Sequence, residues 1–402
     1  MIKPLYALGA FGASLLVQTL TLWLFPFYVA LGPVRLAPEQ VGLSLALGRL
    51  ANSAADLLVA RWSDTLTTPW GRRRPFLLAG SPLLASCFVL LWLPPERGTP
   101  VYLAAVLAGF FALFAAVVNP YLALLADLDL PGPGRVAAAA WQAGGNLLGT
   151  AAAYVLSGPV HSRFGFPAMA MAFGLASVAC VCSAAWSVRH EPAASGQASL
   201  AQALGLLARS VPLRAYLVGL SLAWVGLSMV SLVLVFLVTV LMGLPVPAVP
   251  GILSAALLST GACLPVVARW GQRAGPQRTL EVCLWVAAVF LPMVSLLGYL
   301  PVSPELAGYA LVGLSGLPLA ALYSLPNAIL AQLAARHGFQ ALHFGVQGLV
   351  LNLANAAAAA AAGLLLRWGY APGHDLGLRL VPACAALLVT AGLLAFRRLR
   401  HS

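Results

Sequence analysis

The chain is a succession of apolar stretches, each about as long as a membrane-spanning helix. A helix needs roughly 20 apolar residues to cross ~30 Å of hydrocarbon. Twelve segments satisfy this length, at residues 5–31, 39–62, 75–94, 100–127, 136–159, 167–188, 213–242, 249–270, 279–299, 306–333, 344–367 and 377–396. Because backbone groups in lipid must be hydrogen-bonded internally, these segments predict an all-α membrane protein with twelve transmembrane helices.

The composition agrees with a membrane protein and excludes a soluble one. Of the 402 residues, 61% are hydrophobic and 8% are charged, and the mean hydropathy is +0.93. A soluble chain could not bury so much apolar surface. The net charge of +12 comes from basic residues in short loops between the spans. This pattern is typical of topology signals and lipid headgroup contacts, so we expect no nucleic-acid partner.

The basic residues also predict the orientation of the chain. If both termini are cytoplasmic, the cytoplasmic segments carry most of the arginines, including Arg72–Arg74. The outer loops then hold only Arg35, Arg97, Arg163, Arg367 and Arg379. This positive-inside bias favours cytoplasmic termini. Lys3 is the only lysine, and the excess of arginine suggests a GC-rich genome and therefore a bacterial source. We expect a monomer in the inner cell membrane.

The longest interruption between spans is Arg189–Pro212. It predicts an N-terminal six-helix bundle at 1–188, a cytoplasmic central loop at 189–212 and a C-terminal six-helix bundle at 213–402. Within the loop, Leu200–Arg209 has the pattern of a short amphipathic helix on the membrane surface.

The two predicted halves repeat each other in sequence. The corresponding segments are Asn119–Asp127 with Pro326–Gln332, and Gln142 and Asn146 with Gln347 and Asn352. Related halves of six spans each are typical of secondary transporters whose binding site lies near the bilayer midplane.

A basic loop between the second and third spans carries the family resemblance. It contains Trp62-Ser-Asp64 and, further on, Gly71-Arg-Arg-Arg-Pro75. This loop resembles the signature between helices 2 and 3 of the major facilitator superfamily. More narrowly, it is similar to that of the glycoside–pentoside–hexuronide:cation symporters (the melibiose permease group) and of the sucrose transporters. The resemblance covers nearly the whole chain and implies the major facilitator fold and transport by alternating access.

The resemblance also implies a gating role for this loop. Asp64, Gly71 and Arg72, Arg73 and Arg74 would close the cytoplasmic side, with Asp127 as a partner. The alternative is that the arginines only anchor the topology of the chain.

Two ionisable residues lie near the middle of the second span, where each costs ~3 kcal/mol or more to bury. Arg49 and Asp56 are seven residues apart and share a helical face with Asn52 and Ser53. We expect Asp56, with Asn52 and Ser53, to bind the coupling cation or proton, and Arg49 to contact Asp56 or the substrate. The alternative is a buried structural ion pair.

The chain departs from the melibiose-type pattern where that family holds its cation and its sugar. By the resemblance, charged residues of the family are replaced by Asn52, Ser14, Val118 or Asn119, Gln142 and Asn352. A single carboxylate is a poor sodium site, because a hard cation needs several oxygen ligands. In an apolar environment the carboxyl group can instead carry a proton. We therefore expect proton coupling or no coupling, with sodium the less favoured ion, and no other cofactor or metal.

Neutral polar and aromatic side chains are the predicted lining of the substrate site. They are Ser14, Gln18, Trp23, Arg49, Asn119, Trp141, Gln142, Asn146, Trp224, Tyr323, Asn327, Gln347, Asn352 and Asn355. Such a set suits an uncharged, polyhydroxylated ligand. The alternative for each amide is a hydrogen bond between helices, a frequent use of Asn and Gln in membranes.

These observations favour a transporter of a sugar or glycoside. An alternative with the same fold is a carrier of a lipid-like or hydrophobic compound, or a drug exporter, because the sugar-holding acids are lost. No catalytic or metal-binding motif favours an enzyme, and the six cysteines lie inside apolar spans without metal-ligand spacing. A receptor that transports nothing remains compatible with the sequence, although it would not need Asp56.

Overall fold

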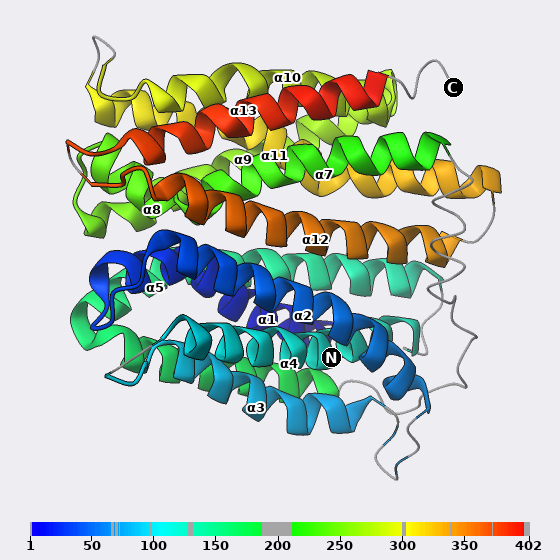
Figure 1. Ribbon diagram of the computed structural model, residues 1–402. Coiled ribbons are helices and arrows are strands. Elements are labelled where there is room, and N and C mark those ends of the chain that lie inside the picture. The colour runs from blue at the N-terminus through cyan, green and yellow to red at the C-terminus, as the bar shows by residue number, and fades with distance from the viewer. Residues whose placement is uncertain are drawn as a thin grey trace. The chain divides into compact units, whose positions relative to one another are not determined.

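The computed structural model describes residues 2–65, 68, 71, 73–96, 99–127, 132–186, 211–299, 303–337, 340–371 and 373–397. The contacts divide the chain into two compact units. The first comprises Met1–Leu36 with Leu43–Gln197, and the second comprises Ala37–Gly42 with Ala198–Ser402. Both units are helical in their described parts, as Figure 1 shows.

The first half of the chain contains five helical elements. They are α1 (Ile2–Pro26), which continues as the π-helical turn η1 (Phe27–Leu31), α2 (Pro38–Thr65), α3 (Arg74–Leu91), α4 (Pro100–Asp127) and α5 (Gly132–Ala185). α5 comprises two helices that meet at Gly165, whose φ of 83° and ψ of 163° lie outside the helical region. A residue with a side chain would be strained at this positive φ.

The second half follows a similar order. Its elements are α7 (Val211–Leu232), the short α8 (Leu234–Phe236), the π-helical turn η2 (Leu237–Leu241), the 3₁₀ turn η3 (Val246–Ala248), α9 (Val249–Ala274), α10 (Pro276–Ser295), α11 (Pro304–His337), α12 (Gln340–Leu366) and α13 (Leu376–Arg397). Proline is the first residue of α10 and α11, where its missing N–H needs no helical acceptor.

Counting the two helices of α5 separately, the described residues form twelve long helical segments, one for each predicted span. Ten stretches within the described ranges are long and apolar enough to cross a membrane, with Trp141–Ala185 counted once. α2 is not among these ten; it carries Arg49 and Asp56 in its centre. The predicted all-α membrane fold of twelve helices is confirmed.

Close packing in the first unit centres on α1 and α5. A Cβ atom at Gly145 or Gly149 of α5 would collide with the backbone carbonyl oxygens of Ala7 and Phe11 on α1. Glycine at these two positions therefore allows the two helix backbones to approach directly.

In the second unit α7 packs against α12 and α13, α9 against α11, and α10 against α11 and α13. α10 and α13 run side by side in Figure 1. Gly219 of α7 faces Gly392 of α13, and a Cβ at either position would press on the other backbone.

Candidate functional site

A carboxylate with two amide donors lies between α2 and α4. Asn52 donates its Nδ2 hydrogen to Oδ2 of Asp56 at 2.9 Å, one helical turn away. Asn119 of α4 donates to Oδ1 at 2.7 Å. Asn52 is buried, with 7% of its surface exposed. Both carboxylate oxygens thus accept a hydrogen bond, and the two amides hold the group in one orientation.

The other predicted residues of α2 lie beside this cluster. The guanidinium of Arg49 lies over the ring of Phe111 on α4, 4.4 Å from its centroid, which is a cation–π contact. Ser53 is buried and donates its hydroxyl to the carbonyl oxygen of Arg49 at 3.3 Å. Arg49 and Asp56 of α2 therefore both contact α4.

A ladder of polar contacts joins α1 to α5. Tyr6 donates its hydroxyl to Oε1 of Gln142 at 3.4 Å. Further along α1, Ser14 contacts Asn146, and Tyr154 donates to Oε1 of Gln18 at 3.4 Å. The predicted residues Ser14, Gln18, Gln142 and Asn146 are thus brought together as pairs across one helix interface.

A matching ladder joins α7 to α12. The hydroxyl of Tyr216 lies 2.8 Å from Oε1 of Gln347 and 2.8 Å from the carbonyl oxygen of Pro326. Gln347 donates in turn to Oδ1 of Asn327 on α11 at 3.1 Å. Tyr216 and Gln347 are buried, so this ladder fixes the register of three helices.

The amide of Asn355 is the second contact point of this ladder. Trp224 donates its indole N–H to Oδ1 of Asn355 at 3.1 Å, and Ser228 donates to the same atom at 3.3 Å. The ring of Tyr323 stands edge-on to Trp224, with centroids 6.2 Å apart. Tyr323 is 61% exposed. The predicted residue Asn352, also on α12, is partly buried.

The residues that α1 and α7 contribute to the two ladders have the same register. Tyr216, Trp224 and Ser228 of α7 each follow Tyr6, Ser14 and Gln18 of α1 by 210 positions. The π-helical turns Phe27–Leu31 and Leu237–Leu241 are also 210 positions apart. The internal repeat inferred from the sequence thus extends to the first helix of each half, where the sequences themselves differ.

The two other tryptophans of the predicted substrate site, Trp23 and Trp141, occupy contrasting environments. Trp23 is fully buried; it donates to the Oγ of Ser157 at 2.8 Å and packs edge-on against His161 at 4.1 Å between centroids. Its place in the core favours a packing role. Trp141 on α5 is 53% exposed.

Part of the predicted gating loop can be described. Gly71 has a φ of 98° and donates its N–H to the carbonyl oxygen of Thr68 at 3.0 Å. Arg73 is buried, and the guanidinium of Arg74 lies 5.9 Å from the ring centroid of Trp186. Arg72 and the side chains of Asp64 and Asp127 lie outside the described residues, as does the predicted surface helix Leu200–Arg209.

The structure adds residues that the sequence analysis did not single out. Tyr6 and Tyr216 contact the glutamines of the two ladders. Their equivalent positions in the two repeated halves were the signal that could have identified them. Glu281 of α10 is a buried acid, with 7% of its surface exposed, whereas Asp56 is half-buried. An acidic residue inside an apolar span was the available signal. Among the described residues, no three His, Cys, Asp or Glu side chains gather as metal ligands.

Comparison with known proteins points to one family. The model of the family described as MFS/sugar transport protein matches residues 5–375. An uncharacterized symporter of Synechocystis is 27% identical over 135 residues, which is 31% of this chain and 24% of the relative. A sucrose transport protein of Arabidopsis thaliana is 32% identical over 127 residues, or 26% of this chain and 21% of the relative. The alignments therefore span about a quarter or less of these two relatives.

Solved structures share the fold at low sequence identity. A mutant of the nucleoside transporter NupG superposes with a TM-score of 0.77 at 13% identity, covering 99% of this chain and all of that one. A bacterial homologue of the human lysosomal transporter Spinster gives a TM-score of 0.72 at 12% identity, covering 100% of this chain and 95% of that one. Both similarities concern the arrangement of helices alone.

Proposed function

Because the chain belongs to the family of MFS/sugar transport proteins, we propose that it moves a sugar or glycoside across the membrane by alternating access. The bundles at 1–188 and 213–402 are the two moving halves, and both termini are cytoplasmic. The protein acts as a monomer, in the inner membrane of a bacterium. The family match over residues 5–375 and the name of the sucrose-transporting relative support the substrate class.

Asp56 carries the proposed coupling. Its carboxylate oxygens accept hydrogen bonds from Asn52 and Asn119, and these two amides orient the group. A carboxyl group inside a bilayer can be neutral when protonated and charged when not, so its proton occupancy changes the energy of the surrounding helices. Proton binding and release at Asp56 then drive accumulation of the solute.

The polar ladders supply the proposed sugar contacts. Asn146, Asn327, Asn355 and the ring of Tyr323 lie at their less buried positions. Each amide offers both donors and acceptors, as hydroxyl groups of a sugar require. The buried members of the ladders, Gln347 among them, would hold these groups in place.

The loop with Gly71, Arg73 and Arg74 forms the proposed cytoplasmic gate, together with Asp64, Arg72 and Asp127. The left-handed turn at Gly71 and the burial of Arg73 support a defined loop conformation. A mere topology signal needs no buried arginine.

Proteoliposome uptake tests this function. Proteoliposomes that contain the purified wild-type protein are incubated with labelled glucose, galactose, sucrose, a methyl glucoside or a lysolipid. Uptake of each compound is measured with an inward proton gradient, an inward sodium gradient or no gradient. We expect accumulation of a sugar or glycoside with the proton gradient. Lysolipid flux without sugar or glycoside flux would overturn the substrate class, and sodium-driven accumulation would overturn the coupling ion.

The variant Asp56→Asn assigns the coupling group. Its side chain has nearly the same shape but cannot release a proton, so gradient-driven accumulation should fall to the equilibrium level while counterflow exchange continues. Glu281→Gln is the matched control, since it makes the same carboxyl-to-amide change at a buried acid of the second unit. Accumulation that survives in Asp56→Asn and is lost in Glu281→Gln would move the coupling role to α10.

A further inference from the structure

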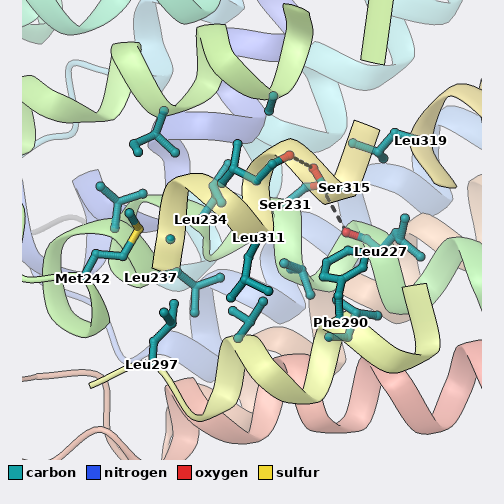
Figure 2. A pocket seen from close by; sticks show the side chains of 18 residues that line it. Leu227, Ser231, Leu234, Leu237, Met242, Phe290, Leu297, Leu311, Ser315 and Leu319 are labelled. Carbon is teal, nitrogen blue, oxygen red and sulfur yellow. Dashed lines mark hydrogen bonds between the residues drawn. The ribbon is translucent and has the colours of Figure 1, made fainter. Parts of the chain in front are cut away.

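An apolar cavity of about 120 Å³ lies inside the second unit, among α7, η2, α9, α10 and α11. Figure 2 shows Leu237, Met242, Phe290 and Leu311 directed into it. Two serines are the only polar side chains of the lining, and each hydroxyl already donates within its own helix. Ser231 donates to the carbonyl oxygen of Leu227 at 3.1 Å and Ser315 to that of Val312 at 2.7 Å. The cavity therefore offers a hydrocarbon surface to an occupant.

The first unit fills the equivalent positions with aromatic rings. Leu237 and Val238 line the cavity and follow Phe27 and Tyr28 by 210 positions. The ring of Phe27 packs on Trp92 with centroids 5.2 Å apart, and Tyr28 donates its hydroxyl to the carbonyl oxygen of Leu91 at 2.7 Å. Leucine and valine in place of these rings free space in the second unit. An unfilled cavity destabilises a fold, so its presence in the second unit calls for an occupant.

One end of the cavity adjoins the polar part of the second unit. Leu227 on α7 and Leu319 on α11 are the lining residues nearest to this end. One helical turn further, Trp224 and Tyr323 bring their rings within 6.2 Å of each other. Asn355 accepts hydrogen bonds from Trp224 and Ser228 at the same level. An apolar pocket and a polar, partly exposed cluster therefore share the same pair of helices.

We propose that this cavity binds the apolar aglycone of a glycoside substrate, a group about as large as a phenyl ring, while the sugar lies against Trp224, Tyr323 and Asn355. The proposal rests on the sugar or glycoside class assigned above and narrows it to glycosides with a hydrophobic substituent. The size agrees with a ring, because an apolar protein cavity of ~150 Å³ binds benzene. A free sugar would leave the cavity empty, and a long acyl chain would exceed it.

The wild-type protein can be tested with matched ligands. Binding of methyl and phenyl glycosides of glucose and galactose, both anomers of each, is measured by competition against a labelled phenyl glycoside in detergent. We expect the phenyl compound to bind on the order of 50-fold tighter than the methyl compound of the same sugar, from the apolar area of the ring that leaves water. Equal affinity of the two would overturn the proposal and leave sugar transport intact.

Two variants locate the effect in the cavity. Ala256→Phe adds a ring to a lining residue of α9 and should abolish the preference for phenyl over methyl while methyl glycoside binding persists. Phe290→Ala enlarges the cavity and should shift the preference toward naphthyl glycosides. Val289→Phe is the control, because Val289 neighbours Phe290 on α10 but is 64% exposed and does not line the cavity.

The outcomes separate this proposal from the function on which it rests. If no sugar and no glycoside binds or is transported, the proposed function fails. If both are transported but Ala256→Phe and Val289→Phe keep the phenyl preference equally, the cavity is not the aglycone site. If benzyl alcohol competes as well as the phenyl glycoside does, the cavity binds apolar molecules without a sugar and the glycoside assignment is wrong.

Discussion

The two halves of the chain share a helical framework but fill it differently. In each, a tyrosine on the first helix contacts a glutamine on the fifth, Tyr6 with Gln142 and Tyr216 with Gln347. Around this framework the first unit holds Asp56 and a cluster of aromatic rings. Neutral amides lie on this framework in both halves, and the second unit differs by its apolar cavity.

The difference shows which parts of a repeat are constrained by folding. Contacts that set the distance and register of two helices persist because all later packing depends on them. The surrounding positions are free to diverge, since a titratable group and a solute-sized space are each needed only once in a transporter. Three pairs of substitutions test this division between framework and specialised residues.

The largest effect is expected at the closest helix contact. Gly149→Ala would place a Cβ against the carbonyl oxygen of Phe11, whereas Gly348→Ala on α12 meets nothing within 4 Å. Overpacking of this kind should cost about 3 kcal/mol and sharply lower the yield of folded protein. Size-exclusion profiles and thermal unfolding in detergent measure it. Similar behaviour of the two variants would mean that α1 and α5 can separate freely.

A smaller effect is expected from two asparagines in corresponding segments of the repeat, one on α4 and one on α11. Asn119→Ala removes a donor to the Asp56 carboxylate, while Asn327→Ala removes an acceptor from the neutral Gln347 amide. A hydrogen bond to a charged group is worth more, so Asn119→Ala should reduce proton-driven accumulation roughly tenfold and Asn327→Ala several times less. Uptake ratios in proteoliposomes decide this. A larger loss for Asn327→Ala would show that the proposed sugar contact limits accumulation more than the orientation of Asp56 does.

The smallest effect is expected from the two ladder tyrosines. The hydroxyl of Tyr216 donates to one of two acceptors that each lie 2.8 Å away, whereas the contact between Tyr6 and Gln142 is 3.4 Å long. Tyr216→Phe should therefore lower stability by about 1 kcal/mol and Tyr6→Phe by about 0.5 kcal/mol or less. The comparison is made by thermal unfolding of the two purified variants, with uptake as a check that both remain active. The reverse order would show that the first ladder is the stronger.

Much of the fold could be predicted because a bilayer restricts what a chain can do. Each apolar segment of about 20 residues became a helix, and the family resemblance in the loop after the second span agreed with the family match over residues 5–375. The sequence predicted which residue types belong to the candidate site, but it did not predict which of these residues contact one another. Asp56 and Asn119 were both named, yet their hydrogen bond joins residues 63 positions apart. Trp23 was assigned to the ligand from its chemistry, and its burial against Ser157 and His161 favours packing instead.

The sequence by itself therefore determined the membrane environment, the number of helices, the family and the acid in the middle of the second span. These properties depend on hydrophobicity and on the order of residues along short segments of the chain. Only the tertiary structure decided which polar residues pair, and that the second unit contains a cavity lined by Leu237 and Val238. Pairing and empty space depend on how side chains from distant segments meet, and spacing along one helix does not reveal that.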